Sequence, residues 1–80
     1  MPDDPALLQE RAEAALLLGD PVQAEALARR AFETGSQVGP LCRRHRATIE
    51  QARLLAGDAA GAAAARAQVD QCTVAGVNRF

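Results

Sequence analysis

Three side chains in the C-terminal half of the chain have the chemistry to bind a soft metal ion or to react with oxidants: Cys42, His45 and Cys72. Cys42 and His45 are three residues apart, which places them on one face of a helix. Cys42 lies 15 residues before Gly57, and Cys72 lies about as far beyond the same turn signal. Because a helix rises 1.5 Å per residue, an antiparallel hairpin would hold both thiols at one level, about 21 to 23 Å from the turn.

Such a group of ligands suggests zinc, which takes three protein ligands in catalytic sites and four in structural ones. The sequence offers neither a fourth ligand nor a CxxC pair. We therefore favour two packed, reduced thiols beside a partly buried histidine, and we expect no metal and no cofactor. Two alternatives stay open: a metal- or redox-responsive site formed by Cys42, His45 and Cys72, and a Cys42–Cys72 disulfide outside a reducing cytosol.

Residues 43–46 form the only run of basic side chains. A solvated helix face explains such a run well, because Arg46 and Glu50 have salt-bridge spacing, as do Glu25 and Arg29. The alternative is a docking patch for an acidic partner, with three candidate contact residues: Arg43, Arg44 and Arg46. With only two aromatic residues available to stack on bases, we expect no nucleic-acid binding.

The sequence shows no pattern typical of a catalytic site. It has no nucleophile elbow, no phosphate-binding glycine loop and no convincing pair of carboxylates. His45 is the only histidine, and no residue nearby is suited to orient it as a base. We therefore expect a protein that is not an enzyme.

The composition indicates one small domain, residues 1–80, with a limited core. Nineteen of its hydrophobic residues are alanines, which favour helix but bury little surface. The net charge of −1 and the lack of a long apolar run predict no membrane association. No signal peptide is evident, so we expect a cytoplasmic protein, and the Ala- and Arg-rich composition is typical of a GC-rich bacterial genome.

Helix start and stop signals divide the chain into four helices. Asp-Pro, Asp-Pro and Asp-Ala pairs are typical of helix starts, and Gly19, Gly35 and Gly57 of helix ends. They predict an all-α fold with helices over residues 5–18, 21–34, 41–56 and 59–72. The expected organisation is a helix hairpin over 5–34, a linker over 35–40, a second hairpin over 41–72 and a flexible tail over 73–80.

Apolar spacing predicts which face of each helix is buried. The first helix has a stripe of Leu8, Ala12, Ala15 and Leu16, and the second has Ala24, Leu27, Ala28 and Ala31. The third presents Leu41, Thr48, Ile49, Ala52 and Leu55, and the fourth Ala62, Ala65, Val69 and Cys72. Connections of one or two residues within each hairpin make its helices antiparallel neighbours.

The two hairpins are related by an internal repeat, because Gly57-Asp58 follows Gly19-Asp20 at an offset of 38 residues. With helix, Gly-Asp turn and helix in each half, the chain resembles a pair of tetratricopeptide repeats. In the first repeat the matching positions are Leu8, Ala12, Gly19, Asp20, Ala24 and Ala31, and the departures are Arg11, Ala15 and Ala28. In the second, Ile49, Ala62 and Val69 match, whereas Arg46, Glu50, Arg53 and Arg66 depart.

The resemblance implies a right-handed stack of hairpins, and a small closed four-helix bundle is the alternative. The 38-residue offset exceeds the 34 residues of the family, and the linker accounts for the difference. Two such hairpins leave outer faces unmatched, so we expect a protein–protein interaction module that associates with itself or with another protein, as a subunit or chaperone-like adaptor. Leu7, Leu17 and Leu18 lie partly off the main stripe and are the candidate contact residues. The alternative is a purely structural subunit with a helical-bundle fold.

Overall fold

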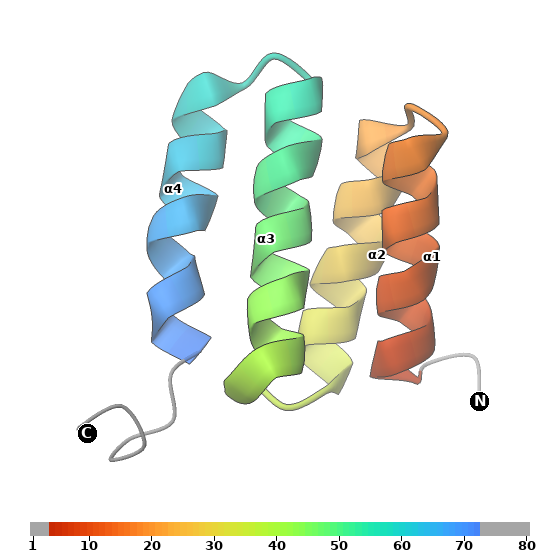
Figure 1. Cartoon of the computed structure of the whole chain (residues 1–80), viewed down its shortest axis with the longest axis vertical. Coiled ribbons are helices and arrows are strands. Elements are labelled where there is room, and N and C mark those ends of the chain that lie inside the picture. The colour runs from red at the N-terminus through yellow and green to blue at the C-terminus, as the bar shows by residue number, and fades with distance from the viewer. Residues whose placement is uncertain (1–3, 73–80) are drawn as a thin grey trace.

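A computed structural model describes residues 4–72, and this part of the chain is helical apart from short connections. Its elements are α1 (Pro5–Leu17), α2 (Pro21–Thr34), α3 (Gly39–Leu55), α4 (Ala59–Val69) and a single 3₁₀ turn, η1 (Asp70–Cys72) (Figure 1). The prediction of an all-α fold with four helices is confirmed. The tail expected over 73–80 lies outside the described residues. No helix within the described range has both the length and the apolar character needed to cross a membrane.

The two hairpin turns have the same backbone hydrogen bonds. Gly19 and Gly57 both adopt positive φ angles, of 76° and 82°, which glycine tolerates without strain. The amide of each glycine donates to the carbonyl three residues earlier, and the next amide donates to the carbonyl five residues before it. These bonds form a Schellman motif at the end of α1 and again at the end of α3. The Gly-Asp repeat of the sequence therefore specifies one turn used twice.

Aspartate caps begin three of the helices, as the sequence predicts. Asp4 accepts from the amide of Ala6 at 2.9 Å, Asp20 from that of Gln23 at 3.1 Å, and Asp58 from that of Gly61 at 2.8 Å. Each bond satisfies an amide that has no partner within its helix.

The linker differs from the prediction in two respects. First, α3 begins at Gly39, two residues earlier than expected, because Pro40 is accommodated in the first turn of the helix. Second, Gly35 has an extended backbone (φ −107°) and not the left-handed conformation expected at a helix end. Its role is to permit a close approach, since a Cβ atom there would lie 2.8 Å from the Cβ of Pro5.

The helices lie side by side in chain order and form an open array (Figure 1). α2 packs against both α1 and α3, α1 also contacts α3, and α4 packs against α3 and η1. Among the described elements, α1 and α4 do not touch, so the array does not close into a bundle. The principal extents of 38 × 34 × 16 Å describe a flat molecule with a free edge at each side.

The core consists mainly of alanines that let the helices approach closely. Its larger apolar members are Leu8 on α1, Leu27 on α2 and Ile49 on α3. The stripes predicted for α1 and α2 are confirmed, although Leu16 is only half-buried. On α4 only two alanines, Ala62 and Ala65, are fully buried.

The face predicted for α3 is wrong at its ends. Leu55 is 53% exposed and Leu41 is half-buried, whereas Cys42 and His45 are completely buried. The helix is therefore rotated so that its N-terminal half presents the cysteine and the histidine to the interior. Thr48, which the sequence did place inside, is buried on the same face.

Candidate functional site

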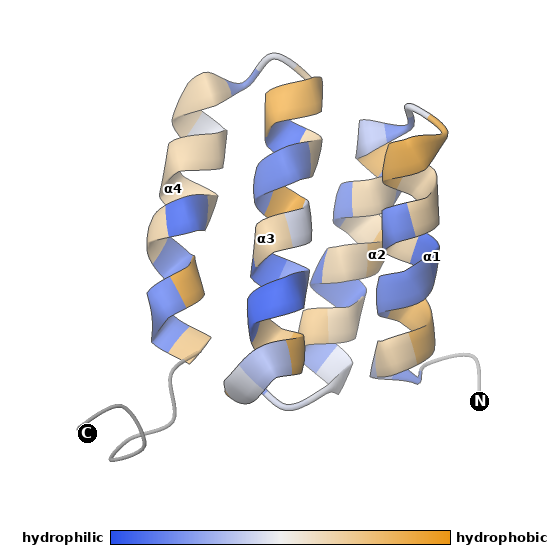
Figure 2. Cartoon of the chain, viewed as in Figure 1, coloured by the Kyte–Doolittle hydropathy of each residue, from blue (hydrophilic) through white to orange (hydrophobic). Residues whose placement is uncertain are grey.

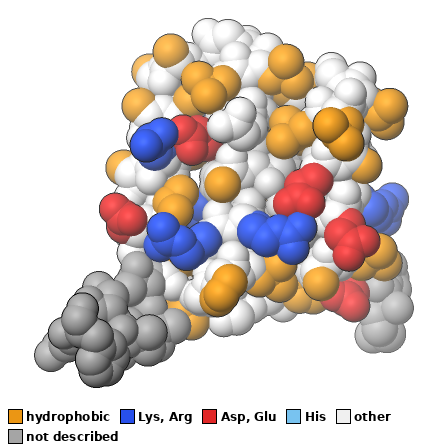
Figure 3. Space-filling view, in the orientation of Figure 1, with side chains coloured by type: hydrophobic (Ala, Val, Ile, Leu, Met, Phe, Trp, Pro, Cys, Tyr) orange, Lys and Arg blue, Asp and Glu red, His pale blue; other side chains and the backbone are white. Residues whose placement is uncertain are grey.

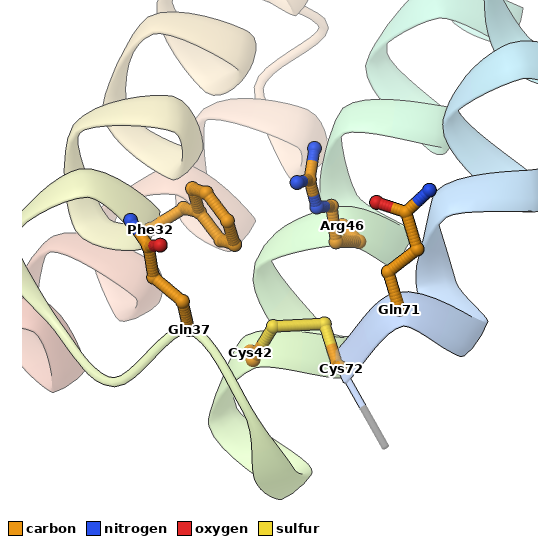
Figure 4. A pocket seen from close by; sticks show the side chains of 6 residues that line it. All are labelled: Phe32, Gln37, Cys42, Arg46, Gln71 and Cys72. Carbon is orange, nitrogen blue, oxygen red and sulfur yellow. A yellow bond between two sulfur atoms is a disulfide. The ribbon is translucent and has the colours of Figure 1, made fainter. Parts of the chain in front are cut away.

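Cys42 and Cys72 form a disulfide that ties the first turns of α3 to η1 (Figure 4). Their Cα atoms are 5.7 Å apart across 30 residues of sequence. The prediction that both cysteines lie at one level of the hairpin is confirmed. The preference for two reduced thiols is wrong for this structure, because the helix phases that bury both cysteines also point them at each other. Neither residue is exposed to solvent.

A small cavity of roughly 220 Å³ lies beside the disulfide, with α2, the linker, α3 and η1 as its walls (Figure 4). Its lining residues are Phe32, Gln37, Cys42, Arg46, Gln71 and Cys72. The guanidinium carbon of Arg46 lies 4.0 Å from the centre of the Phe32 ring, a cation–π arrangement. Arg46 also donates to the side-chain oxygen of Gln68 at 2.7 Å. The charged side chain that lines this cavity is therefore a cation, and neighbours on two other helices hold it.

His45 belongs to a buried polar cluster that joins α1 to α3. The amide nitrogen of Gln9 donates to the hydroxyl of Thr48 at 2.6 Å and to the carboxylate of Glu13 at 2.8 Å. The amide oxygen of Gln9 must then accept from Nδ1 of His45, which is 2.7 Å away. This fixes the tautomer with the proton on Nδ1. Nε2 of His45 is buried and has no hydrogen-bond partner among the described residues.

Burial favours the neutral form of His45. Desolvation, together with the charge of Arg44, lowers the pKa of His45 below its ordinary range, and the charge of Glu13 only partly offsets this. The residue faces the hairpin–hairpin interface and lines neither the cavity beside the disulfide nor the open grooves on the hairpins. Its contacts are those of a group that positions helices.

The three residues proposed as a metal site do not converge. The two sulfur atoms are bonded to each other, and Nδ1 of His45 is held by Gln9 on another helix. Within the described residues no three His, Cys, Asp or Glu side chains are grouped as metal ligands would be.

The basic run is divided between surfaces of different kinds. Arg44 reaches across to α1 and binds Glu13 through two nitrogens, at 2.8 and 3.2 Å. His45 is buried, Arg46 is half-buried against Phe32, and Arg43 is exposed. The four residues thus form no single patch. The expected Arg46–Glu50 pair is replaced, because Glu50 lies 3.6 Å from Arg66 on α4, whereas the expected Glu25–Arg29 pair is present.

Ion pairs also join neighbouring helices across the array. Arg53 of α3 binds both carboxylate oxygens of Glu25 on α2, at 3.0 and 3.2 Å, and donates to the carbonyl of Gly61 on α4 at 3.1 Å. Hydrogen bonds from Arg53 hold the pKa of Glu25 below its usual value, and Arg44 does the same for the pKa of Glu13. Arg44 and Arg53 therefore join α3 to the first hairpin through ion pairs.

Large apolar side chains are exposed at the end of the molecule that carries both hairpin turns. The ends of α1 and α3 are hydrophobic there (Figure 2). Leu17 is 89% exposed and Leu18 84%, and they share this end with Val22, Leu54 and Leu55. We call these five residues the turn-end patch. In the space-filling view of the face over α1, α3 and α4, separate hydrophobic side chains lie at this end beside one basic and one acidic group, and further groups of both signs lie lower (Figure 3).

Two open grooves mark the free faces of the hairpins. One lies between α3 and α4, and its lining residues are Arg43, Ala47, Glu50, Ala63, Arg66, Ala67, Val69 and Asp70. The other lies between α1 and α2, and its lining residues are Arg11, Ala14, Ala15, Leu18, Asp20, Gln23 and Leu27. Leu7 is 46% exposed on α1, away from the turn-end patch.

Gln9 is the residue at the hairpin interface that we did not predict. Its spacing carries a signal, because Gln9, Ala12 and Leu16 follow a three-four pattern on the inner face of α1. A glutamine on that face indicates a buried hydrogen-bond network.

Comparison with known proteins provides no relative for this chain. No family model, no curated protein and no solved structure matches it.

Proposed function

We propose that this protein is a non-catalytic protein–protein interaction module, and that its contact surface is the turn-end patch. The observation that carries the proposal is the exposure of five large aliphatic side chains at one end of a molecule whose core is built mostly from alanine. Exposed aliphatic groups gathered in one area are typical of surfaces that another protein covers. Leu17 and Leu18 are the expected anchors.

The partner is another protein or a further copy of this chain, as a subunit or an adaptor would have. The resemblance to tetratricopeptide repeats supports this proposal, as does the near-identity of the two hairpin turns. The net charge of −1, with both signs interspersed on the face shown in Figure 3, offers no attraction for nucleic acid. We further propose a bacterial source and a cytoplasmic location. A stable disulfide would require an oxidising environment, so the location is best tested together with the thiol state.

A capture experiment with matched variants tests the function. The tagged protein is incubated with an extract of its source cells, and bound proteins are quantified by mass spectrometry. We expect Leu17→Lys combined with Leu18→Lys to abolish the capture of a specific protein that the native chain retains. Ala64→Lys, a change at an exposed residue of α4 outside the turn-end patch, serves as the control. Equal capture by all three forms would refute the turn-end patch as the contact surface.

A redox-responsive regulator is a second candidate, and the Cys42–Cys72 disulfide is the observation that favours it. A regulatory disulfide would exchange with cellular thiols, whereas a structural one has a reduction potential below about −300 mV and stays oxidised in the glutathione pool. Thiol trapping in glutathione buffers of graded potential separates the two. A midpoint within the range of cellular glutathione supports regulation, and full oxidation throughout that range excludes it.

A further inference from the structure

The packing of the two hairpins against each other suggests how a second copy of the chain would bind. The 38-residue offset of the turns extends to whole helices, because adding 38 to the bounds of α2 gives residues 59–72, the range of α4 and η1 together. Positions that differ by 38 residues therefore occupy equivalent places on the two hairpins. Because of this equivalence, the interface between the two hairpins predicts a second interface, between one copy of the chain and another.

The groove between α3 and α4 is the counterpart of the surface that holds α3. On the first hairpin, α3 packs against a surface that includes Gln9, Ala12, Glu25, Ala28 and Ala31, through hydrogen bonds, ion pairs and the shared core. The equivalents of these residues are Ala47, Glu50, Ala63, Arg66 and Val69, and all five line the open groove. The second hairpin thus presents, uncovered, the place that the first uses to bind a helix.

The exposed face of α1 is equivalent in position to the face of α3 that packs against the first hairpin. The residues of α3 that face the first hairpin are His45, Thr48, Ile49 and Ala52. Their equivalents on α1 are Leu7, Glu10, Arg11 and Ala14, which are all exposed. Arg11 and Ala14 also line the groove between α1 and α2. Both halves of the internal interface therefore recur unmatched, one on α1 and one on the α3–α4 hairpin at the other side of the array (Figure 1).

The side chains of the two faces are complementary in charge and in polarity. By equivalence, Leu7 would lie over Ala47, an apolar contact in place of the internal His45–Gln9 hydrogen bond. Arg11, in place of Ile49, would meet Glu50, because Ile49 shares a core cluster with Ala12. Among the described residues, the ion-pair partner of Glu50 is Arg66, at 3.6 Å, and the side chain of Arg66 is 79% exposed. Arg11 of a second molecule would therefore pair with the carboxylate of Glu50, whose partner in its own chain is 3.6 Å away.

We propose that copies of this chain stack head to tail, with α1 of one copy seated in the α3–α4 groove of the next. This inference rests on the proposed interaction function and names the partner as a second copy of the chain. Because the two faces differ, the contact is heterologous, and each copy keeps one face free to bind a further copy. The assembly is then an open row whose length increases with concentration.

Two variants and their mixture test the stacking. Ala47→Arg blocks the groove, and Leu7→Arg blocks the face of α1, while Ala26→Arg on α2 is the exposed control. Sedimentation velocity from about 10 µM to about 1 mM measures association, and circular dichroism verifies that each variant folds. We expect the native chain and the control to form concentration-dependent oligomers. Each blocked variant should associate at least about tenfold more weakly.

The mixture gives the decisive result. Ala47→Arg keeps a working α1 face and Leu7→Arg keeps a working groove, so an equimolar mixture should form one-to-one dimers and nothing larger. Oligomers that persist in both blocked variants would overturn the stacking but leave the turn-end patch as the proposed contact. A native chain that stays monomeric at the highest concentration would also overturn the stacking. The same holds if Ala47→Arg, and no other variant, lowers the melting temperature of the monomer, because the chain would then cover its own groove.

Discussion

Removing the disulfide is expected to destabilise the protein strongly, and the size of the effect follows from the loop that it closes. The bond spans 30 residues of sequence. In the loop-entropy description, a cross-link over a loop of this length stabilises the folded state by about 3.6 kcal/mol at 25 °C. For a domain of this size, such a change lowers the melting temperature by roughly 15 to 30 °C.

The loss should be concentrated in the second hairpin. α4 contributes only Ala62 and Ala65 to the fully buried core, and α3 is the one α-helix that it contacts within the described residues. Without the disulfide, its attachment depends on these alanines and on side-chain contacts such as Arg53 to Gly61. We therefore expect the amides of α4 to exchange hydrogen much faster in the reduced protein, while those of α1 and α2 change less.

Thermal melts followed by far-UV circular dichroism provide the assay. They compare the native protein, the same protein in reductant, and the double variant Cys42→Ala, Cys72→Ala. The reductant should lower the melting temperature of the native protein to that of the variant and leave the variant unchanged. A difference below about 5 °C, or two free thiols titrated in the native, unreduced protein, would refute the reasoning.

Three further predictions concern single side chains. Because the pKa of His45 is lowered in the folded state, the unfolded chain binds the proton first as the pH falls. The free energy of unfolding should therefore be greatest above about pH 7 and decrease as the pH falls through about 6.5. Urea titrations should show this pH dependence, and its persistence in His45→Gln would exclude the histidine as its source. Gly35→Ala should cost roughly 1 to 3 kcal/mol in the same titrations, because the new Cβ would lie 2.8 Å from that of Pro5. Arg53→Met should cost about 1 to 2 kcal/mol through the lost contacts with Glu25, and a difference that does not shrink at high salt would argue against an ionic origin.

The sequence predicts the elements of this fold well because local chemistry determines them. Asp20 and Asp58 cap helices, and Gly19 and Gly57 supply the left-handed residue that ends the preceding ones. These signals act over a few residues and depend little on what packs nearby. The alanine stripe of α2 is similarly clear, because nearly every residue of that stripe is small and apolar.

The rotation of α3 could not be predicted in the same way. Its sequence has apolar residues at both ends and polar ones between, so Leu55 and His45 compete for the inner face. Burial of His45 is favoured only because Gln9, on another helix, provides a hydrogen-bond acceptor at 2.7 Å. The disulfide depends on the same rotation, which points Cys42 at Cys72. Both outcomes depend on tertiary contacts that no local pattern encodes.

The disulfide also determines how the chain would respond to being pulled from its ends. Tension applied beyond Cys72 passes through the sulfur atoms directly to Cys42, so most of α3, the second turn and α4 carry no load. Within the part of the chain that the structure describes, only the segment before Cys42 can extend. Reduction would release the segment between the two cysteines, which are 30 positions apart, adding roughly 100 Å of contour length. In a single-molecule force experiment, unfolding of the second hairpin therefore adds no extension until the disulfide is reduced.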